Sequence, residues 1–308
     1  MMKIQHVLLA ILVAAIWGLS FIVVKIGLTQ CPPLLLAALR FVVVFAVGVL
    51  LFPRPTLPWR LYLRAGLCLG VIQFAGLFSA IKLGMPAGIV SVLAQVQVFI
   101  TLLLANVLLQ ETRSAVQKAV MALALLGVLL LGYARYHDAL PLLPLLLALL
   151  GAAGFAWGNI ELKRSGKVDM FGFAVWMSVV PPLPLLLLSF TLEGGPAAAW
   201  SVLAHFTWTG LLALLFLALI GTLFALGSWG KLLSLYPATL VAPFSLLSPV
   251  FGLLGGYVIL QERYDGLSIL ASALIVAALA LNTYAGKLGA FKGWLQRAHL
   301  TIKGLPHR

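Results

Sequence analysis

Apolar runs long enough to cross a membrane recur along the whole chain. A run of about 20 predominantly apolar residues crosses the ~30 Å hydrocarbon core of a bilayer as an α-helix. Ten such runs can be placed, separated by short connections with turn-forming residues, such as PRPTLP and EGGP. They cover residues 5–28, 33–52, 61–83, 86–109, 115–134, 141–163, 171–192, 207–231, 237–260 and 266–286. The sequence therefore predicts an all-α polytopic membrane protein with ten transmembrane helices.

The composition supports this class. Of the 308 residues, 63% are hydrophobic and only 9% are charged, whereas charged residues make up about a quarter of a typical soluble domain. Most of the surface must therefore face hydrocarbon rather than water. The first run follows Lys3 and resembles a signal peptide, but it is too long for the apolar region of one and further runs follow it. We expect it to remain as a membrane helix.

Enzymatic and metal-binding functions find no support in the residue pattern. Cys31 and Cys68 fall in different predicted spans or at their edges, and the sequence has no CxxC motif and no His/Cys metal spacing. An integral-membrane enzyme would need a nucleophile, a metal cluster or an acid–base pair within the spans, and a channel would need rings of like residues from symmetric subunits. We expect no catalytic activity, no cofactor and no metal.

The distribution of positive charge predicts the orientation. An even number of spans places both termini on one side, and positively charged residues are enriched on the cytoplasmic side. With cytoplasmic termini, the outer loops hold two such residues, Arg135 and Arg263. The cytoplasmic segments hold 15, namely Lys3, Arg54, Arg60, Arg64, Arg113, Lys118, Lys163, Arg164, Lys167, Lys231, Lys287, Lys292, Arg297, Lys303 and Arg308. The net charge of +13 thus indicates topology and contact with anionic lipid headgroups rather than nucleic-acid binding.

The two halves of the chain are similar to each other. The segment GMPAGIVSVL…VLLQE (84–111) aligns without gaps on LYPATLVAPF…VILQE (235–262), an offset of 151 residues. Five spans in each half force the halves into opposite orientations. Inverted repeats are typical of secondary transporters, whose substrate site lies near the midplane where the halves meet. We predict a first repeat at 1–136, a second at 137–286 and a basic cytoplasmic tail at 287–308; chance similarity between apolar helices is the alternative.

Several segments resemble a known family. They are WGLSFIVVKIGL (17–28), PPLLLAALRF (32–41), QFAGLFSAIKLGMPAGIVSVLAQVQVFITLLL (73–104), WGNIELK (157–163) and APFSLLSPVFGLLGGYVILQER (242–263). Together they resemble the drug/metabolite transporter superfamily, EamA-type family, over nearly the whole chain except the last twenty residues. The GMPAG…QVQVF segment is the one more specific to the metabolite-exporter subgroup.

The resemblance implies a ten-helix bundle of two inverted repeats in the bacterial inner membrane. It also implies export of small zwitterionic amino-acid metabolites, cysteine and O-acetylserine, by alternating access. A broader exporter of aromatic amino acids or hydrophobic amines is the alternative within the same superfamily. We expect a monomer or a weak homodimer surrounded by membrane lipid.

Charged residues inside the spans are Lys25, Arg40 and Lys82, all toward the outer side. Lys25 and Lys82 lie close enough to helix ends to snorkel. Arg40 lies about seven residues in, ~10 Å deep at 1.5 Å per residue. It either caps a helix end or backbone carbonyls, or it draws a substrate carboxylate outward. Coupling of transport to protons normally needs a titratable side chain in the transport pathway, and no carboxylate occupies a mid-membrane position. We therefore predict facilitated export or exchange rather than tight proton coupling. Glu161, near a cytoplasmic helix end, is the carboxylate that remains available as a proton relay.

The fourth run carries two amides, Gln95 and Gln97. On one continuous helix they extend two polar stripes ~160° apart, one with Ser91 and one with Thr101. We expect one amide to face the substrate cavity and the other to bind a neighbouring helix; two packing contacts are the alternative. The substrate-binding candidates are Trp17, Ser20, Arg40, Gln73, Gln95, Gln97, Trp157, Asn159, Trp176 and Ser248.

Prolines predict two further irregularities. Pro243 and Pro249 lie inside the ninth run and predict a discontinuity that lines the cavity, with a simple packing kink as the alternative. Pro181 and Pro182 predict a kink in the seventh run, which we interpret as a gate hinge rather than a binding point.

Overall fold

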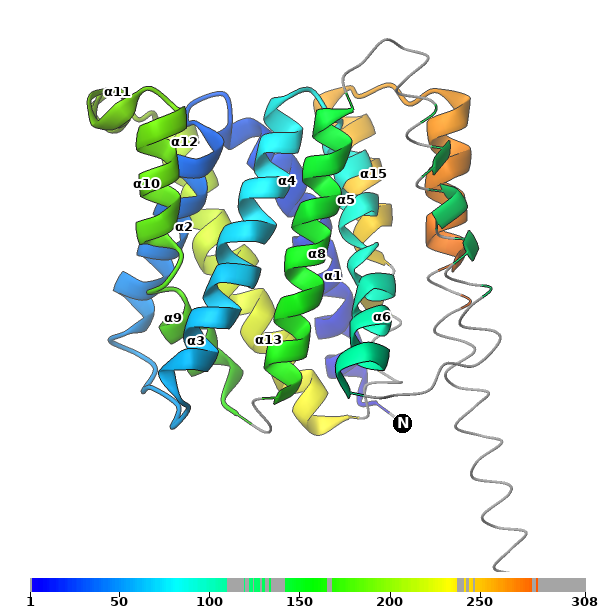
Figure 1. Cartoon of the computed structure of the whole chain (residues 1–308), viewed down its shortest axis with the longest axis horizontal. Coiled ribbons are helices and arrows are strands. Elements are labelled where there is room, and N and C mark those ends of the chain that lie inside the picture. The colour runs from blue at the N-terminus through cyan, green and yellow to red at the C-terminus, as the bar shows by residue number, and fades with distance from the viewer. Residues whose placement is uncertain are drawn as a thin grey trace, which may run out of the picture.

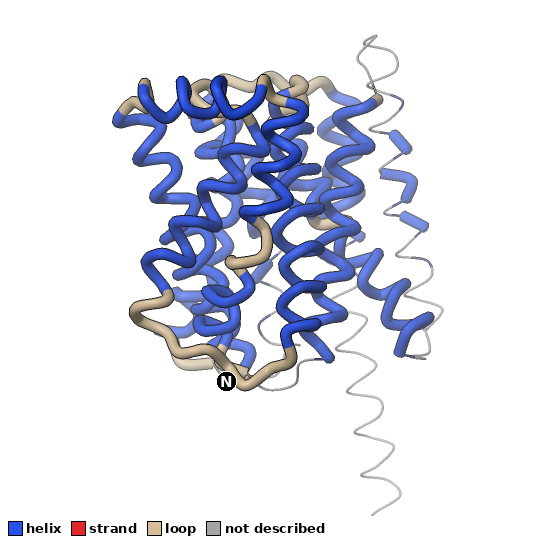
Figure 2. Tube along the Cα trace, turned by 60° about the vertical axis from the view of Figure 1, so that its left-hand side comes forward, coloured by secondary structure: helices blue, strands red, loops and turns tan. Residues whose placement is uncertain are grey.

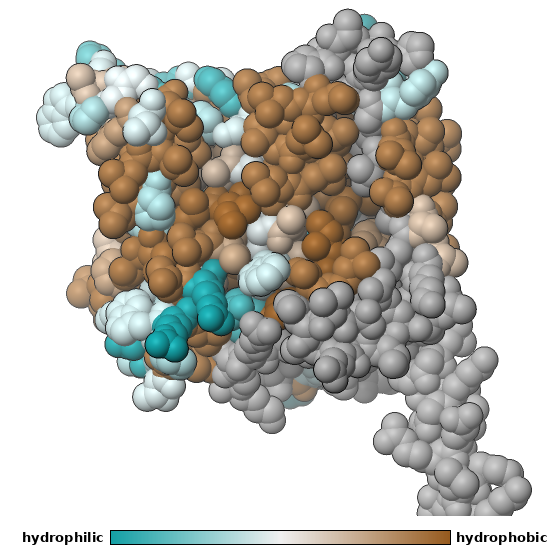
Figure 3. Space-filling view, in the orientation of Figure 1, coloured by the Kyte–Doolittle hydropathy of each residue, from teal (hydrophilic) through white to brown (hydrophobic). Residues whose placement is uncertain are grey.

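A computed structural model shows a bundle of helices that run up and down between two ends, with most connections gathered at those ends (Figures 1 and 2). It describes residues 2–109, 142–164, 168–236 and 247–278, with scattered residues between 119 and 133 and at 241, 244, 245 and 281. Every regular element in these ranges is helical. Large apolar side chains cover most of the described surface in the view of Figure 3, and hydrophilic residues lie toward the ends.

The first half contains seven described elements. They are α1 (Ile4–Gly27), α2 (Pro33–Gly48), α3 (Trp59–Ala65), the π-helical η1 (Gly66–Ile72), α4 (Gln73–Lys82), α5 (Ala87–Ala94) and α6 (Gln97–Leu109). The second half contains α8 (Leu143–Arg164), α9 (Met170–Met177), α10 (Pro182–Leu192), α11 (Gly195–Ala204), α12 (Trp208–Leu215), the π-helical η2 (Phe216–Phe224), α13 (Ala225–Leu235), α15 (Leu247–Leu260) and a last helix, Gly266–Ala278.

The all-helical, multi-span prediction agrees with this architecture. Five helices are long and apolar enough to cross a membrane, and four shorter apolar helices lie at further predicted spans. The predicted span 115–134 falls mostly outside the described residues. The total of ten spans in two inverted repeats therefore stays a prediction.

Local sequence explains where several helices begin. Proline fits the first helical turn, where no backbone donor is needed, and α2 and α10 both begin at a proline. Asp169 caps α9 by accepting hydrogen bonds from the amides of Phe171 and Gly172, each at 3.1 Å.

Some predicted spans are built differently from expectation. The span 86–109 is not one continuous helix, because α5 ends at Ala94 and α6 begins at Gln97. The two amides therefore lie at a helix break, and the angle predicted between their stripes does not apply. The kink predicted at Pro181 and Pro182 is present as a break between α9 and α10. Helix α11 occupies a stretch predicted as a connection.

The ninth predicted span is described as a helix only from Leu247 onward. Pro243 lies outside the described residues. Pro249 is the third residue of the described part of α15, and residue 246, just before that part, lies outside the described residues. The discontinuity expected at the two prolines therefore stays a prediction.

The two π-helical segments lie at corresponding places in the two halves. Adding the 151-residue offset to the bounds of η1, 66 and 72, gives 217 and 223, which lie inside η2. The helix from α3 to α4 rises in Figure 1, whereas the helix from α12 to α13 descends. This is the relation that an inverted repeat would produce.

Helices α1, α5 and α15 pack closely through small residues. A side chain at Gly18 would lie 2.7 Å from Phe251 Cβ and 3.0 Å from the backbone nitrogen of Gly252. A side chain at Gly252 would meet Ser91 of α5. Glycine lets these backbones approach closely. This packing joins helices from the two halves of the chain.

Candidate functional site

Helix α2 carries a charged side chain into the protein interior. Arg40 is only 5% exposed. Its Nε donates a 2.6 Å hydrogen bond to the Thr222 hydroxyl of η2, and that hydroxyl donates in turn to the backbone oxygen of Leu217 at 2.9 Å. Among the described residues, the hydrogen bond of Arg40 therefore goes to a side chain and not to a backbone carbonyl.

An aromatic ring covers the Arg40 guanidinium. The Arg40 Cζ atom lies 4.2 Å from the centroid of the Phe74 ring, close enough for a cation–π interaction. Phe41 packs edge-on against Phe74, with centroids 5.4 Å apart. Among the described residues, no carboxylate pairs with Arg40 and neither Nη group has a hydrogen-bond acceptor.

The π-helical segment η2 shapes the other side of this group. Position 221 is a glycine, and a side chain there would begin 3.1 Å from Ser20 Oγ and 3.8 Å from Arg40 Nη2. The Ser20 hydroxyl donates to the backbone oxygen of Ile16 at 2.6 Å, so it can only accept further hydrogen bonds. Short π-helical segments that interrupt an α-helix are frequent at functional sites. We call Ser20, Arg40, Phe74, Gly221 and Thr222 the arginine site.

The two amides of the fourth span have different surroundings. Gln97 Oε1 accepts a 2.7 Å hydrogen bond from Asn159 Nδ2 of α8, and Thr101 lies 3.5 Å from the same oxygen. Gln95 is half-buried at the end of α5. Gln97 thus makes the contact to a neighbouring helix that was expected of one of the two amides, while a cavity-facing role for Gln95 stays a prediction.

The remaining candidates lie in separate places. The rings of Trp17 and Trp229 pack with centroids 5.2 Å apart. Trp176 Nε1 donates to the backbone oxygen of Phe52 at 3.2 Å. Ser248 is buried, Gln73 is half-buried and Trp157 is 42% exposed. The structure thus brings Ser20 together with Arg40, and Gln97 with Asn159, but it does not gather all ten candidates in one set of mutual contacts.

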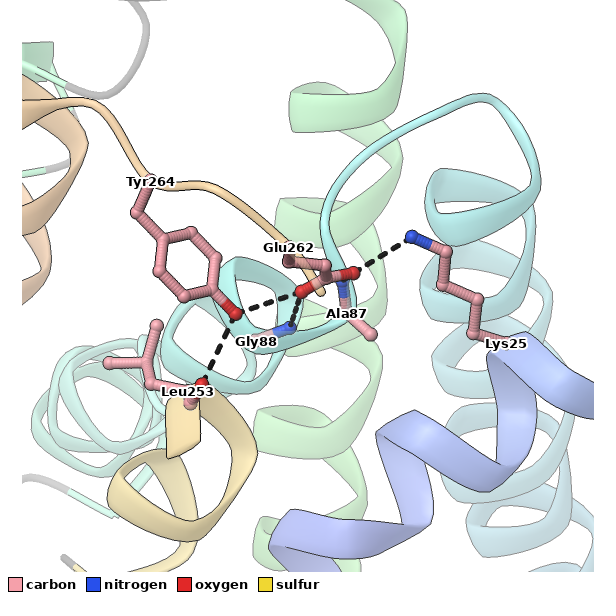
Figure 4. Close-up of polar contacts among 6 residues, drawn as sticks. All are labelled: Lys25, Ala87, Gly88, Leu253, Glu262 and Tyr264. Atoms are coloured by element: carbon pink, nitrogen blue, oxygen red, sulfur yellow. Dashed lines mark hydrogen bonds and ion pairs between the residues drawn. The ribbon is translucent and has the colours of Figure 1, made fainter. Parts of the chain in front are cut away.

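A second buried ionic group lies at the upper end of the bundle in Figure 1. Glu262 follows α15 and is 7% exposed (Figure 4). Its Oε1 accepts from Lys25 Nζ and from the Ala87 amide, each at 2.8 Å. Its Oε2 accepts from the Gly88 amide at 3.2 Å and from the Tyr264 hydroxyl at 2.8 Å. One carboxylate thus contacts α1, the first turn of α5 and the segment after α15.

Physical chemistry explains this arrangement. The first amides of a helix have no intrahelical partners, and negative charge is favoured at a helix N-terminus. Burial alone would raise the pKa of the Glu262 carboxyl. The hydrogen bonds from Lys25, Ala87, Tyr264 and Gly88 outweigh burial and hold its pKa below the ordinary value of 4.5. Glu262 is therefore ionised at neutral pH, and we call these residues the Glu262 cluster.

The cluster adds to what the sequence predicts for this end. Lys25 was expected to snorkel to the helix end, and there its side chain, 40% exposed, pairs with Glu262. Glu262 follows a helix end, yet it is buried and binds the first turn of another helix. Lys82 donates to the backbone oxygen of Leu28 at 3.0 Å.

Two further carboxylates bind across helices. Glu193, after α10, accepts from the amides of Leu34 and Leu35 in the first turn of α2, at 2.9 and 3.2 Å. Glu161 is buried, with Oε2 3.8 Å from Arg64 Nη1. Only the recurrence of Leu-Gln-Glu at the end of both repeat segments could have pointed to Glu262, whereas Thr222, Phe74 and Glu193 carry no sequence signal of their contacts.

Substituting Glu262 by glutamine should destabilise the protein. We expect the free energy of unfolding to fall by about 3 kcal/mol, because removing one partner of a buried ion pair leaves the other groups unsatisfied. Tyr264→Phe, which keeps the carboxylate and removes one donor, should cost about 1 kcal/mol. Thermal unfolding in detergent micelles measures both.

The pH dependence follows from the lowered pKa of Glu262. A carboxylate with a lowered folded-state pKa stabilises the protein above the unfolded-state value, and this stability is lost as pH falls through the folded-state pKa. The difference between wild type and Glu262→Gln should be constant from pH 8 to about pH 5 and shrink below 4.5. Equal stability of the two proteins at pH 7 would contradict the role of this carboxylate.

Comparisons with known proteins agree with this architecture. The EamA-like transporter family matches residues 5–133 and 142–284. A "Probable amino-acid metabolite efflux pump" of Salmonella typhimurium is 40% identical over 281 residues, covering 90% of this chain and 94% of the relative. A protein of the same name in Escherichia coli K12 is 38% identical over 285 residues, with the same coverage.

More distant relatives also match over most of the chain. Protein PecM of Dickeya dadantii is 26% identical over 279 residues, covering 86% of this chain and 88% of that protein. A solved crystal structure superposes with a TM-score of 0.60 at 20% identity, covering 93% of this chain and 99% of the other. At that identity the likeness concerns the fold alone. With both halves matched by the family and relatives near 40% identity over nine-tenths of its length, this chain belongs to the EamA-like transporter family.

Proposed function

We propose that this protein exports small amino-acid-like metabolites, cysteine and O-acetylserine among them, across the bacterial inner membrane. The observation that carries the proposal is the identity of 38–40%, over 90% of the chain, with two proteins that bear the name "Probable amino-acid metabolite efflux pump". The arginine site adds chemical support, because a buried cation and hydroxyl groups suit a small polar solute better than a purely apolar one.

The charge distribution supports an orientation for export. The N-terminus and the connection between α2 and α3 lie at the lower end in Figure 1. This connection and α3 carry Arg54, Arg60 and Arg64. Positive residues favour the cytoplasmic side, so we assign the lower end and the N-terminus to the cytoplasm; the C-terminus lies outside the described residues, and an even number of spans would place it on the same side. The Glu262 cluster then lies at the periplasmic end.

The Glu262 cluster supports alternating access. A carrier of this type opens one end at a time by moving one group of helices against another. The cluster fastens α1 and α5 to the segment after α15 by an ion pair and by two backbone hydrogen bonds. We infer that it is the periplasmic latch, closed in this structure, and that it must open for the substrate to leave.

Transport into inside-out vesicles tests the proposed function. Because such vesicles expose the cytoplasmic face, an exporter should accumulate labelled L-cysteine or O-acetylserine saturably, and each should compete with the other. Vesicles without the protein give the background. If only aromatic amino acids or hydrophobic amines are transported, the broader-exporter alternative replaces this substrate assignment. If no amino-acid metabolite accumulates, the proposed function is wrong.

Removing one contact of the latch tests its part in transport. Lys25→Gln eliminates the ion pair but keeps the carboxylate on the first turn of α5. Weakening the latch favours the form open to the periplasm over the closed form that takes up substrate from the cytoplasm, so we expect transport to slow about fivefold, the effect of shifting a two-state equilibrium by about 1 kcal/mol. Lys82→Gln, which removes a lysine contact to a backbone oxygen at the same end, should change the rate less. Unchanged transport by Lys25→Gln at normal membrane abundance would argue against a latch.

A further inference from the structure

The arginine site contains an ionic group whose charge the described protein does not balance. We propose that it is the subsite for the amino-acid head of the substrate, in which Arg40 binds the carboxylate and Ser20 accepts a hydrogen bond from the ammonium group. This inference rests on the proposed export function and names the chemistry that selects the substrate.

The charge and geometry of Arg40 favour a carboxylate ligand. A buried charge is costly unless it is paired and hydrogen-bonded. Thr222 occupies Nε, and no described residue accepts from Nη1 or Nη2. These two groups can together donate to both oxygens of one carboxylate, the planar arrangement for which a guanidinium is well suited.

The neighbouring side chains fix how Arg40 can be approached. Phe74 packs over the guanidinium at 4.2 Å, and the hydrogen bond to Thr222 holds the Nε edge. Both contacts limit the rotation of the side chain. The Nη edge is therefore the part left for a ligand, which gains from the preorganised donor.

Ser20 supplies the complementary acceptor. Its hydroxyl proton is used by the backbone oxygen of Ile16 at 2.6 Å, so the Ser20 oxygen offers only lone pairs. An ammonium group has donors and no acceptor, so it fits Ser20 and not Arg40. The two side chains thus present opposite hydrogen-bonding character to the two charged groups of a zwitterion.

Gly221 keeps the backbone of η2 close to these two groups. A methyl group at this position would lie 3.1 Å from Ser20 Oγ, closer than an ordinary contact, and 3.8 Å from Arg40 Nη2. Such a group would press on Ser20 and stand beside the Nη edge that the proposed ligand must reach. Glycine is the residue that allows a ligand to approach a helix backbone closely.

This arrangement distinguishes classes of substrate. An amino acid brings the anion that Arg40 lacks, whereas an amine without a carboxylate adds a second positive charge beside it. The arginine site therefore selects zwitterionic metabolites and rejects hydrophobic amines.

Competition for labelled L-cysteine uptake into inside-out vesicles tests this selection. The competitors are unlabelled L-cysteine, its methyl ester and cysteamine. The ester lacks the free carboxylate, and cysteamine lacks the whole carboxyl group. For the wild type we expect the ester and the amine to compete about 10- to 100-fold more weakly, the usual range for losing a charge-assisted hydrogen bond. Equal competition by all three would overturn the subsite.

Two variants locate the effect. Arg40→Gln should raise the KM for cysteine at least tenfold and remove the preference over the ester, whereas Arg60→Gln, at an exposed arginine, should keep both. Gly221→Ala should likewise weaken cysteine transport, whereas Gly266→Ala, where a side chain meets no atom within 4 Å, should not. A wild-type preference retained in folded Arg40→Gln contradicts the proposal.

The outcomes separate the subsite from the proposed function. If the wild type accumulates cysteine but does not discriminate against the ester, export stands and the subsite is wrong. If the wild type accumulates no amino-acid metabolite, both are wrong. If Arg40→Gln does not reach the membrane, the wild-type competition series and Gly221→Ala decide the question.

Discussion

The carboxylate of Glu262 joins parts of the bundle that are far apart in the chain. It neutralises Lys25 of α1 and caps the first turn of α5, while its own backbone follows α15. Four donors compensate the cost of burying this charge, which is why the pKa of Glu262 lies below its ordinary value. The close packing of α1 against α15 at Gly18 brings these helices within reach of one another.

Glu262 and Arg40 are buried charges with opposite degrees of compensation. Glu262 is surrounded by protein donors, so its role is to hold helices together. Arg40 has a hydroxyl and an aromatic ring but no described anion. A transporter needs both kinds of group. A binding site whose charge is already paired within the protein would gain little from a substrate, whereas a latch whose charge has no partner in the protein would not stay closed. We therefore propose that the Glu262 cluster gates one end of the bundle and that the arginine site recognises the substrate.

Much of the architecture is readable from the sequence, because lipid imposes a simple rule on helix length and polarity. The helical class, most of the span positions and the break at Pro181 follow from it. The break at Gln95 does not follow from this rule, since no proline or glycine marks it. Helix α11 could not be predicted either, because it lies in a connection that begins with Gly and Pro. Arg40 and Ser20 could be selected as candidates because they are polar within apolar runs. Their partner Thr222 and the ion pair of Lys25 could not, because such contacts depend on how helices separated by about 180 to 240 residues pack.

Amide hydrogen exchange at Ala87 and Gly88 tests the latch most directly. These two amides open a helix and have no intrahelical partner, so their protection depends on Glu262. We expect slow exchange of this segment in the resting wild type, and faster exchange both in Glu262→Gln and during transport of an added substrate. Exchange that is equally fast in the resting wild type and in Glu262→Gln would contradict a carboxylate latch at this end of the transporter.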